Sequence, residues 1–347
     1  MPYDIVTFGE AMLRLRPSGG QRLEQAASLE MTAGGGELNV AVGCARLGFK
    51  SAWVSRLPDN PLGRFIEGKA LEQGVCTRHV VKAKDGRAGI YFLEEGASPR
   101  AQAVVYDRAD SSISRIKPGE IDWSKVFDGA KRFHVSGITP ALSPSAAEVT
   151  KEALVAAQQA GLQVSYDLNY RSKLWTKEAA RACQEPLMRY VDVLITTEED
   201  TKVVFGIEAP KKGVDSELFT KVETYGFRDV ALKLADKFGF KGVAVTLREN
   251  TSVWFNSWWG LYLNADKKTF FESPRHEVEI VDRVGAGDSF AAGLLAALEI
   301  APGNYDHAIR FAAAMSALKH SIPGDFCIVT RAEVETLMKG GGLRIVR

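Results

Sequence analysis

The stretch from Val281 to Phe290, which reads V-D-R-V-G-A-G-D-S-F, constrains this chain more than any other. An apolar run with a strand-like pattern (278, 280 and 281) leads into it, and an alanine-rich helical pattern over 290–298 leads out of it. Gly285 and Gly287 are therefore expected where a strand gives way to a helix. The first backbone N–H groups of a helix have no partner within it and carry the positive end of its dipole. Because glycine lets an anion approach the main chain closely, the stretch predicts a cradle for a phosphate or an oxyanion.

Two acids, Asp282 and Asp288, flank this glycine turn. A carboxylate beside a bound phosphate is electrostatically costly unless it does chemistry there. One such task is to take the proton from a hydroxyl while backbone amides stabilise the charge on a moving phosphoryl group. We expect the two acids to lie at the strand end and the helix start and to face one cleft. The alternative is a tight turn in which Asp288 only caps the helix. A dinucleotide-binding turn is excluded because Phe290 occupies the place of its third glycine.

A second glycine cluster, Gly34 to Gly36, precedes another helical pattern. Here too a ligand could approach the backbone closely, and the amide of Asn39, one turn into the helix, could bind a hydroxylated molecule. A flexible hinge followed by a polar surface residue is the alternative.

A third glycine pattern imitates a phosphate-binding P-loop. Gly63, Gly68 and Lys69 have its spacing, but Ala70 replaces the hydroxyl residue that would hold magnesium. The residues between the glycines continue an amphipathic pattern, so the segment is expected to be a helix.

Composition excludes several classes of protein. The 347 residues carry 44 basic and 43 acidic side chains, without the basic excess of a nucleic-acid-binding surface. No apolar run approaches the roughly 20 residues that span a bilayer, and no signal-like leader begins the chain. The four cysteines are scattered without a metal-binding spacing, as in a reduced cytoplasmic protein. We therefore expect a cytoplasmic location, no nucleic-acid or membrane partner and no metal cage.

The middle of the chain alternates helical and strand patterns. The expected elements are helix 144–160, strand 162–167, helix 177–188, strand 191–195, helix 230–238 and strand 242–247. Such alternation builds a mostly parallel sheet with helices on both faces, and its ligands bind beyond the carboxyl ends of the strands. Residues 167–171, 197–200 and 246–248 should therefore share a rim with Asp288.

Two further regions have the pattern of antiparallel strand pairs. Residues 12–16 pair in this scheme with 29–32, and residues 88–93 pair with 103–106. Together they are expected to form a small sheet that stands apart from the main layer.

With both glycine motifs in place, the chain resembles the ribokinase-like PfkB sugar kinases over essentially its whole length. The matching residues are Gly35, Gly36, Asn39, Ala41, Asp282, Gly285, Ala286, Gly287, Asp288 and Phe290. Several strings resemble the 2-keto-3-deoxygluconate kinases of that family, namely Gly89–Phe92, Tyr106–Ala109, Asp167–Arg171 and Pro323–Phe326. The resemblance implies a single domain over 1–347 with a three-layer α/β/α core. It also implies a discontinuous β-sheet lid, at approximately 12–33 and 87–110, that often serves as a dimer clasp.

The resemblance further implies roles for individual residues. Asp288 would be the base that takes the proton from the primary hydroxyl of the sugar. The anion hole would be formed by Gly285, Ala286 and Gly287. The sugar would be held by Gly35, Gly36, Asn39, Tyr91, Tyr106, Arg108, Asp282 and Asp325. Arg171 would bridge the sugar acid and ATP, and the nucleotide would be bound by Asn169, Gly285, Gly287 and, from a loop over 246–251, Thr246, Arg248 and Asn250.

Residue chemistry favours an acidic sugar. A carboxylate matches the planar fork of arginine, and Arg108 and Arg171 are both predicted to face the cleft. Either arginine could instead pair with a protein acid or with an ATP phosphate. The expected reaction is the phosphorylation of 2-keto-3-deoxygluconate by ATP at the terminal hydroxyl, giving the 6-phosphate, in a homodimer or a larger homo-oligomer. The alternatives are a kinase of another sugar, such as fructose or keto-deoxygalactonate, and a sugar or nucleotide sensor without turnover.

Two departures from the family pattern concern the nucleotide. Thr197 replaces the Asn of an Asn-x-x-Glu motif associated with magnesium and phosphate, although Asp200 keeps an acid. The segment 246–251 lacks both glycines of the common nucleotide-side loop. Mg²⁺ is expected to arrive on the ATP phosphates, largely hydrated.

Overall fold

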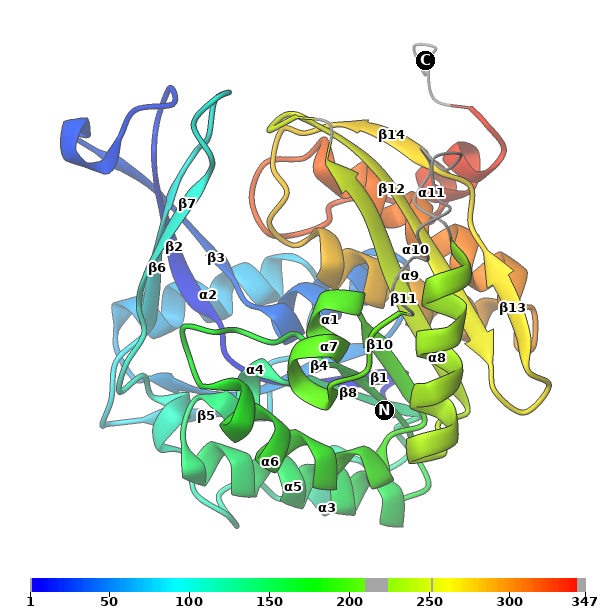
Figure 1. The fold of residues 1–347 in the computed structure, drawn as a ribbon. Helices are drawn as coiled ribbons and strands as arrows, with labels where there is room; N and C mark the ends of the chain where they lie inside the picture. The colour runs from blue at the N-terminus through cyan, green and yellow to red at the C-terminus, as the bar shows by residue number, and fades with distance from the viewer. Residues whose placement is uncertain (1, 210–223, 251, 342–347) are drawn as a thin grey trace.

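The computed structural model describes residues 2–209, 224–250 and 252–341. Its larger sheet has the order β13-β12-β11-β10-β9-β8-β1-β4-β5, with β14 paired to β12 (Figure 1). All neighbours from β11 to β5 are parallel, and only β12, β13 and β14 join antiparallel. The strands are β1 (Ile5–Phe8), β4 (Ser51–Pro58), β5 (Val80–Ala83), β8 (Arg132–Ser136), β9 (Gln163–Asp167), β10 (Val193–Thr196), β11 (Gly242–Asn250), β12 (Phe255–Asn264), β13 (Thr269–Glu272) and β14 (His276–Glu279). The expected mostly parallel α/β sheet is confirmed.

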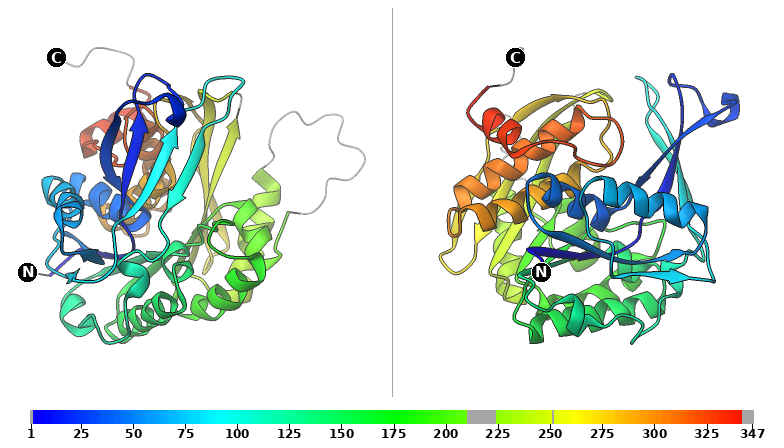
Figure 2. Two further views of the ribbon diagram at one scale, coloured as in Figure 1. Left: turned by 90° about the vertical axis from the view of Figure 1, so that its left-hand side faces the viewer. Right: turned by 180° about the vertical axis from the view of Figure 1, so that it is seen from behind.

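Helices cover both faces of this sheet (Figure 2). The side chains of Val6 and Phe8 join the core under α3 (Trp123–Val126), α5 (Pro144–Gln159), α6 (Lys177–Leu187), α7 (Glu198–Phe205) and α8 (Thr224–Phe238). On the other face, Ile5 packs in the core formed with α1 (Gly36–Arg46), α9 (Ala286–Ile300), α10 (Tyr305–His320) and α11 (Arg331–Met338). Because successive side chains of a strand point to opposite faces, the continuous apolar strands predict this three-layer arrangement.

Four strands form the second, smaller sheet, in the order β3-β2-β6-β7. They are β2 (Met12–Pro17), β3 (Leu29–Gly34), β6 (Gly89–Glu94) and β7 (Ala103–Asp107), and they project beside the carboxyl edge of the large sheet (Figure 1). The two expected antiparallel pairs are confirmed, and β2 joins them by pairing in parallel with β6. The movement of this sheet as a lid stays a prediction.

The P-loop-like spacing lies in a helix, as expected. Helix α2 (Pro61–Glu72) contains Gly63, Gly68 and Lys69. The side chain of Asn60 caps it by accepting from the backbone N–H groups of Leu62 and Gly63, at 3.0 Å each. The short helix α4 (Ile138–Ala141) and the 3₁₀ turns η1 (Leu23–Gln25), η2 (Ile113–Arg115) and η3 (Met188–Tyr190) complete the elements.

The run that precedes the glycine motif departs from the prediction. Strand β14 ends at Glu279, so Ile280 and Val281 are not part of a strand. Their backbone N–H groups donate instead to the carbonyl oxygens of Trp254 and His320, at 2.7 and 2.8 Å. This loop crosses from the sheet to the end of α10, and it carries Asp282 away from the strand end where it was expected.

Candidate active site

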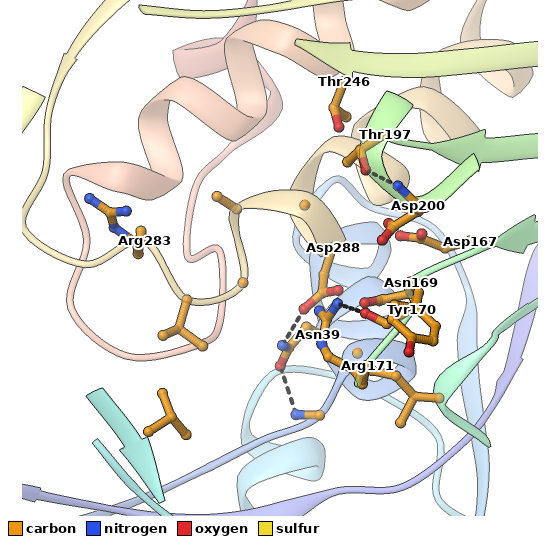
Figure 3. Close-up of a pocket in the computed structure, with 18 of the residues that line it drawn as sticks. Asn39, Asp167, Asn169, Tyr170, Arg171, Thr197, Asp200, Thr246, Arg283 and Asp288 are labelled. Atoms are coloured by element: carbon orange, nitrogen blue, oxygen red, sulfur yellow. Dashed lines mark hydrogen bonds between the residues drawn. The ribbon is translucent and has the colours of Figure 1, made fainter. Parts of the chain in front are cut away.

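One cavity of about 1420 Å³ lies between the small sheet and the carboxyl edge of the large sheet. The segments after β9 and β10, the outer part of β11 and the first turns of α1 and α9 border it, and their labelled polar side chains lie around one space in Figure 3. The shared rim predicted from the strand pattern is therefore present. It includes Asp167, Asn169, Arg171, Thr197, Asp200, Thr246, Arg248 and Asp288.

The glycine turn begins helix α9 as an open anion site. Gly285 is the N-cap, with a φ of 84°, and a Cβ there would lie 2.0 Å from the carbonyl oxygen of Asp325. A Cβ on Gly287 would meet nothing within 4 Å, because that residue faces the cavity. Within the described part of the chain, the backbone N–H groups of Gly287 and Asp288 have no protein acceptor. These donors and the helix dipole suit a phosphoryl oxygen.

Asp288 projects from the first turn of α9 beside this site. Its Oδ2 accepts a hydrogen bond of 2.6 Å from Asn39 Nδ2, and Asn39 Oδ1 accepts from the Gly35 N–H at 3.2 Å (Figure 3). Burial raises the pKa of Asp288 to about 7, with the charge of Asp325 adding to the effect, while Asn39 and Arg171 oppose it. A carboxylate with such a pKa is suited to accept a proton near neutral pH.

Two more acids, Asp167 and Asp200, lie on the same rim. Burial and the charges of Asp200 and Asp288 hold the pKa of Asp167 well above its ordinary value. Burial also raises the pKa of Asp200, against the effect of Arg171. Thr197, which replaces the family's Asn, caps α7 by accepting from the Asp200 N–H at 3.1 Å. Across residues 2–209, 224–250 and 252–341, no cluster of three or more His, Cys, Asp or Glu side chains could hold a metal.

The two arginines predicted to face the cleft have different partners. The Arg108 Nε donates to Glu10 Oε2 at 2.8 Å, and its Nη2 contacts the same oxygen. Arg108 thus pairs with a protein acid, the alternative left open by the sequence. Arg171 lines the cavity and donates to the carbonyl oxygen of Tyr170 at 2.9 Å. Sequence reasoning missed Glu10, although an acid directly after the first strand lies at the same sheet edge.

Asp282 does not face the cavity, so the prediction that both acids share one cleft is wrong. Its Oδ2 lies 2.5 Å from Arg14 Nη2 and accepts from the Gly324 N–H at 2.9 Å. Its Oδ1 accepts from the Val284 N–H at 3.0 Å. Arg14 also contacts Asp325 Oδ1 at 2.9 Å. Asp282 is turned away from the cavity because the buried guanidinium of Arg14 requires carboxylate partners.

Most of the residues predicted to hold the sugar line the cavity. These are Gly35, Gly36, Asn39, Tyr91, Tyr106, Arg108 and Asp325. The hydroxyl of Tyr91 donates to Asp325 Oδ1 at 2.6 Å, which joins the small sheet to the core beside the glycine turn. Asn169 adopts a left-handed conformation with a φ of 39°, which asparagine tolerates.

The expected nucleotide-side loop is instead a strand. Residues Thr246–Asn250 continue β11 and pair with β12, so that Arg248 lies opposite Trp258. Without the family's glycines, this segment forms a regular hairpin ladder. Thr246 and Arg248 line the cavity, whereas the side chain of Asn250 and all of Thr251 lie outside the described residues.

Comparison with known proteins assigns the chain to a family. The model of the pfkB family carbohydrate kinases matches residues 3–325. This chain is a PfkB family carbohydrate kinase. It is therefore a phosphotransferase, and the family resemblance drawn from the two glycine motifs is confirmed.

Named relatives resemble the kinase over at least 94% of its length. A 2-dehydro-3-deoxygalactonokinase of Haloferax volcanii is 39% identical over 347 residues, which is 100% of both chains. A 2-dehydro-3-deoxygluconokinase of Bacillus subtilis is 29% identical over 94% of this chain and 92% of its own. The crystal structure of the 2-dehydro-3-deoxygluconokinase of Thermotoga maritima superposes with a TM-score of 0.90 at 43% identity, covering 98% of this chain and 99% of that one.

Proposed function

We propose that this kinase transfers the terminal phosphoryl group of ATP to the terminal hydroxyl of 2-keto-3-deoxygluconate, giving the 6-phosphate. One observation carries the proposal: Asp288, with a raised pKa, lies beside the uncapped N–H groups of α9 in a cavity that also presents Arg171. A base, an anion site and a cation for the sugar acid are then within one volume.

In this mechanism, Asn39 holds the Asp288 carboxylate toward the sugar. Asp288 accepts the proton of the sugar hydroxyl as the hydroxyl oxygen bonds to the terminal phosphorus of ATP, and the bond from that phosphorus to the oxygen of the leaving ADP breaks. The backbone N–H groups of Gly287 and Asp288 bind the oxygens of the phosphoryl group and the helix dipole stabilises their charge. Closure of the small sheet over the cavity excludes water, which otherwise competes as the acceptor.

The sugar carboxylate is assigned to Arg171. Arg108 is already matched by Glu10, so its charge is largely neutralised before any substrate arrives. Arg171 has only a backbone carbonyl as its hydrogen-bond partner among the described residues, which leaves its charge for a carboxylate. Tyr91, Tyr106, Gly35, Gly36 and Asp325 then contact the rest of the sugar. The 4-epimer, keto-deoxygalactonate, is the second candidate, because the Haloferax relative that matches the whole chain carries that name.

ATP and Mg²⁺ are part of the proposal. Asp167 and Asp200 fit a hydrated Mg²⁺ carried by the ATP phosphates, because both carboxyls line the cavity and the charge of Asp200 disfavours the ionised form of Asp167, a repulsion that a cation relieves. When bound, the ion neutralises phosphate charge. Asn169, Thr246 and Arg248 border the nucleotide side.

The test is a coupled assay of ADP release with MgATP and a panel of substrates that includes both keto-deoxy acids, fructose and ribose. We expect turnover with one or both acids and little with the neutral sugars. Asp288→Asn should lower kcat by about 10³-fold, near the middle of the range for a general base, with nearly unchanged substrate binding. Arg171→Gln should raise KM for the acid only. Turnover of neutral sugars alone contradicts the proposed substrate, and no turnover with any sugar contradicts the proposed reaction.

We also propose a homodimer formed through the small sheet, in the cytoplasm. The outer face of that sheet carries a row of apolar side chains from all four strands, which are Met31, Leu15, Phe92 and Val105 in register. Met31 and Val105 are exposed, at 41% and 53%. The four free cysteines are consistent with a reducing compartment. In the described part of the chain, no helix has the length and apolar character needed to cross a membrane.

A further inference from the structure

One buried cation, Lys319, has no role in the mechanism above. Lys319 lies in the last turn of α10 and is 0% exposed. Within the described part of the chain it is the only buried lysine. A buried ammonium is costly unless both its N–H groups and its charge have partners, so the contacts of Lys319 indicate what it does.

The ammonium of Lys319 bridges two loops through their main-chain carbonyl oxygens. Its Nζ donates to the carbonyl oxygen of Asp282, in the loop before α9, at 3.3 Å. It also donates to the carbonyl oxygen of Ile322, in the turn after α10, at 2.9 Å. A single side chain on α10 thus joins the segment that enters the glycine turn to the segment that packs against it.

The charges around Lys319 favour its ammonium form. The buried carboxylates of Asp282 and Asp325 both contact Arg14. Two carboxylates against one guanidinium leave one negative charge unmatched, and the ammonium of Lys319 balances it. Burial lowers the pKa of Lys319, and Arg14 acts in the same direction, whereas the charges of Asp282 and Asp325 oppose this effect.

Both loops that Lys319 joins support the donors of the anion site. Asp282 precedes the N-cap Gly285 by three residues, and the N–H groups of Gly287 and Asp288 follow in the first turn of α9. On the other side, the carbonyl oxygen of Asp325 packs so closely on Gly285 that a Cβ there would lie 2.0 Å from it. A shift of either loop therefore displaces the two N–H groups.

We propose that Lys319 is a positioning residue for phosphoryl transfer, whose ammonium fixes the two loops so that the N–H groups of Gly287 and Asp288 point at the transferring phosphoryl group. The proposal rests on the proposed function for the role of those N–H groups. Lys319 is not among the residues that line the cavity, so it acts through the main chain and not by touching a substrate. Because these donors bind most strongly in the transition state, a loss of their placement lowers kcat and leaves KM nearly unchanged.

The experiment compares the kinetics of wild type with those of Lys319→Met, which keeps the apolar stem and removes the ammonium. We expect kcat to fall about 10–100-fold, because the donors are misplaced but still present. KM for MgATP and for the sugar acid should stay within about 3-fold, since ground-state binding changes little.

The matched control is Arg132→Met. Arg132 is also a buried cation, 7% exposed, and its Nε lies 2.7 Å from Glu299 Oε1. It begins β8, at the end of the strand away from the cavity, so kcat should stay within about 2-fold of wild type because distant sites act independently.

Chemical rescue separates the charge of Lys319 from its packing. Lys319→Ala opens a space beside the carbonyl oxygens of Asp282 and Ile322, and ammonium chloride supplies a cation with N–H donors of the same kind. Ammonium should raise kcat of this variant at least about 5-fold, the value of one recovered hydrogen bond. Tetramethylammonium chloride at equal ionic strength has no N–H group and should give no rescue. Hydrolysis of ATP by water, measured without sugar, should follow the same pattern because it uses the same donors.

Thermal unfolding of each variant shows whether it is folded at the assay temperature. A folded Lys319→Met with the kcat of wild type overturns the proposal, and so does an equal loss of kcat in Arg132→Met. If the Lys319 variants are unfolded, ammonium should restore both the fold and kcat of Lys319→Ala, and no recovery of kcat overturns the proposal.

Hydrolysis without sugar distinguishes this proposal from the proposed function. If wild type turns over no keto-deoxy acid but Lys319→Met loses the hydrolysis that wild type shows, the proposed substrate is contradicted and the role of Lys319 is supported. A wild type with neither hydrolysis nor turnover of any sugar overturns both.

Discussion

The environment of Asp288 disfavours the ionised form of its carboxyl group. Burial and nearby carboxylates raise its pKa to about 7, and only the Asn39 amide and Arg171 stabilise the ionised form. Asp288 must be ionised to act as a base, and its carboxyl group therefore titrates close to neutral pH. The hydrogen bond from the Asn39 amide keeps this pKa lower than burial alone would make it.

The first prediction concerns this titration. For wild type, kcat/KM should rise with pH through about 7 and level off above it, because the base must lose its proton. Asn39→Ala removes the hydrogen bond that lowers the pKa of Asp288, so the rising limb should move to higher pH. The pH profile of kcat/KM for the sugar acid measures both. An Asn39→Ala profile with an unmoved limb contradicts the assignment of the base.

The same group affects stability with a defined sign. The folded-state pKa is above the unfolded value, so the folded chain binds more protons, and stability falls as pH rises from about 4 to 7. Asp288→Asn, which stays neutral, should therefore be more resistant to thermal unfolding than wild type at pH 8, with a smaller difference at pH 5.

At the scale of elements, one buried ion cluster joins three parts of the fold. Arg14 on β2 pairs with Asp282 in the loop before α9 and with Asp325 in the loop after α10. Burial alone lowers the pKa of Arg14, but Asp325 and Asp282 raise it above its usual value, so the guanidinium stays charged. Tyr91 on β6 donates to the same Asp325. The small sheet is thus fastened to the two loops that flank the glycine turn.

We expect Arg14→Met to destabilise the fold by about 3–5 kcal/mol, because two buried carboxylates lose their partner. Arg16→Met is the matched control on the same strand. Arg16 is partly exposed and pairs with Glu30 and Glu95 near the surface, so its loss should change the free energy of unfolding by at most about 1 kcal/mol. Urea unfolding measures both, and equal effects contradict a special role for Arg14.

At the scale of the whole molecule, the small sheet has two chemically different faces. The inner face presents Tyr91 and Tyr106 to the cavity, and the outer face presents the apolar row of Leu15, Met31, Phe92 and Val105. Exposed apolar rows of this kind are typical of surfaces that a partner covers.

If the outer face is the dimer contact, Met31→Glu and Val105→Glu should shift the sedimentation mass from that of two chains toward one, because each places a charge in an apolar interface. Leu71→Glu is the control, since Leu71 on α2 is 55% exposed and lies outside the row. A wild type that sediments as one chain, or variants that remain dimers, contradicts the proposed interface.

Much of the architecture followed from local patterns. The alternation of helices and strands predicted the parallel sheet and its rim, and the paired strand patterns predicted the small sheet. The glycines of the V-G-A-G-D stretch predicted an exposed helix start with Asp288 in its first turn, because backbone freedom and helix-end donors depend on residues close in sequence.

What the sequence by itself determined was therefore the set of elements and the presence of the chemical groups; tertiary structure decided which group faces which. Asp282 was expected in the cleft, yet it pairs with Arg14, 268 residues away. Arg108 was expected to be available for the substrate, yet it pairs with Glu10, 98 residues away. The attraction between two charges depends on their distance in space and is strongest where both are buried. These pairings therefore depend on how distant segments pack together, which a local sequence pattern does not show.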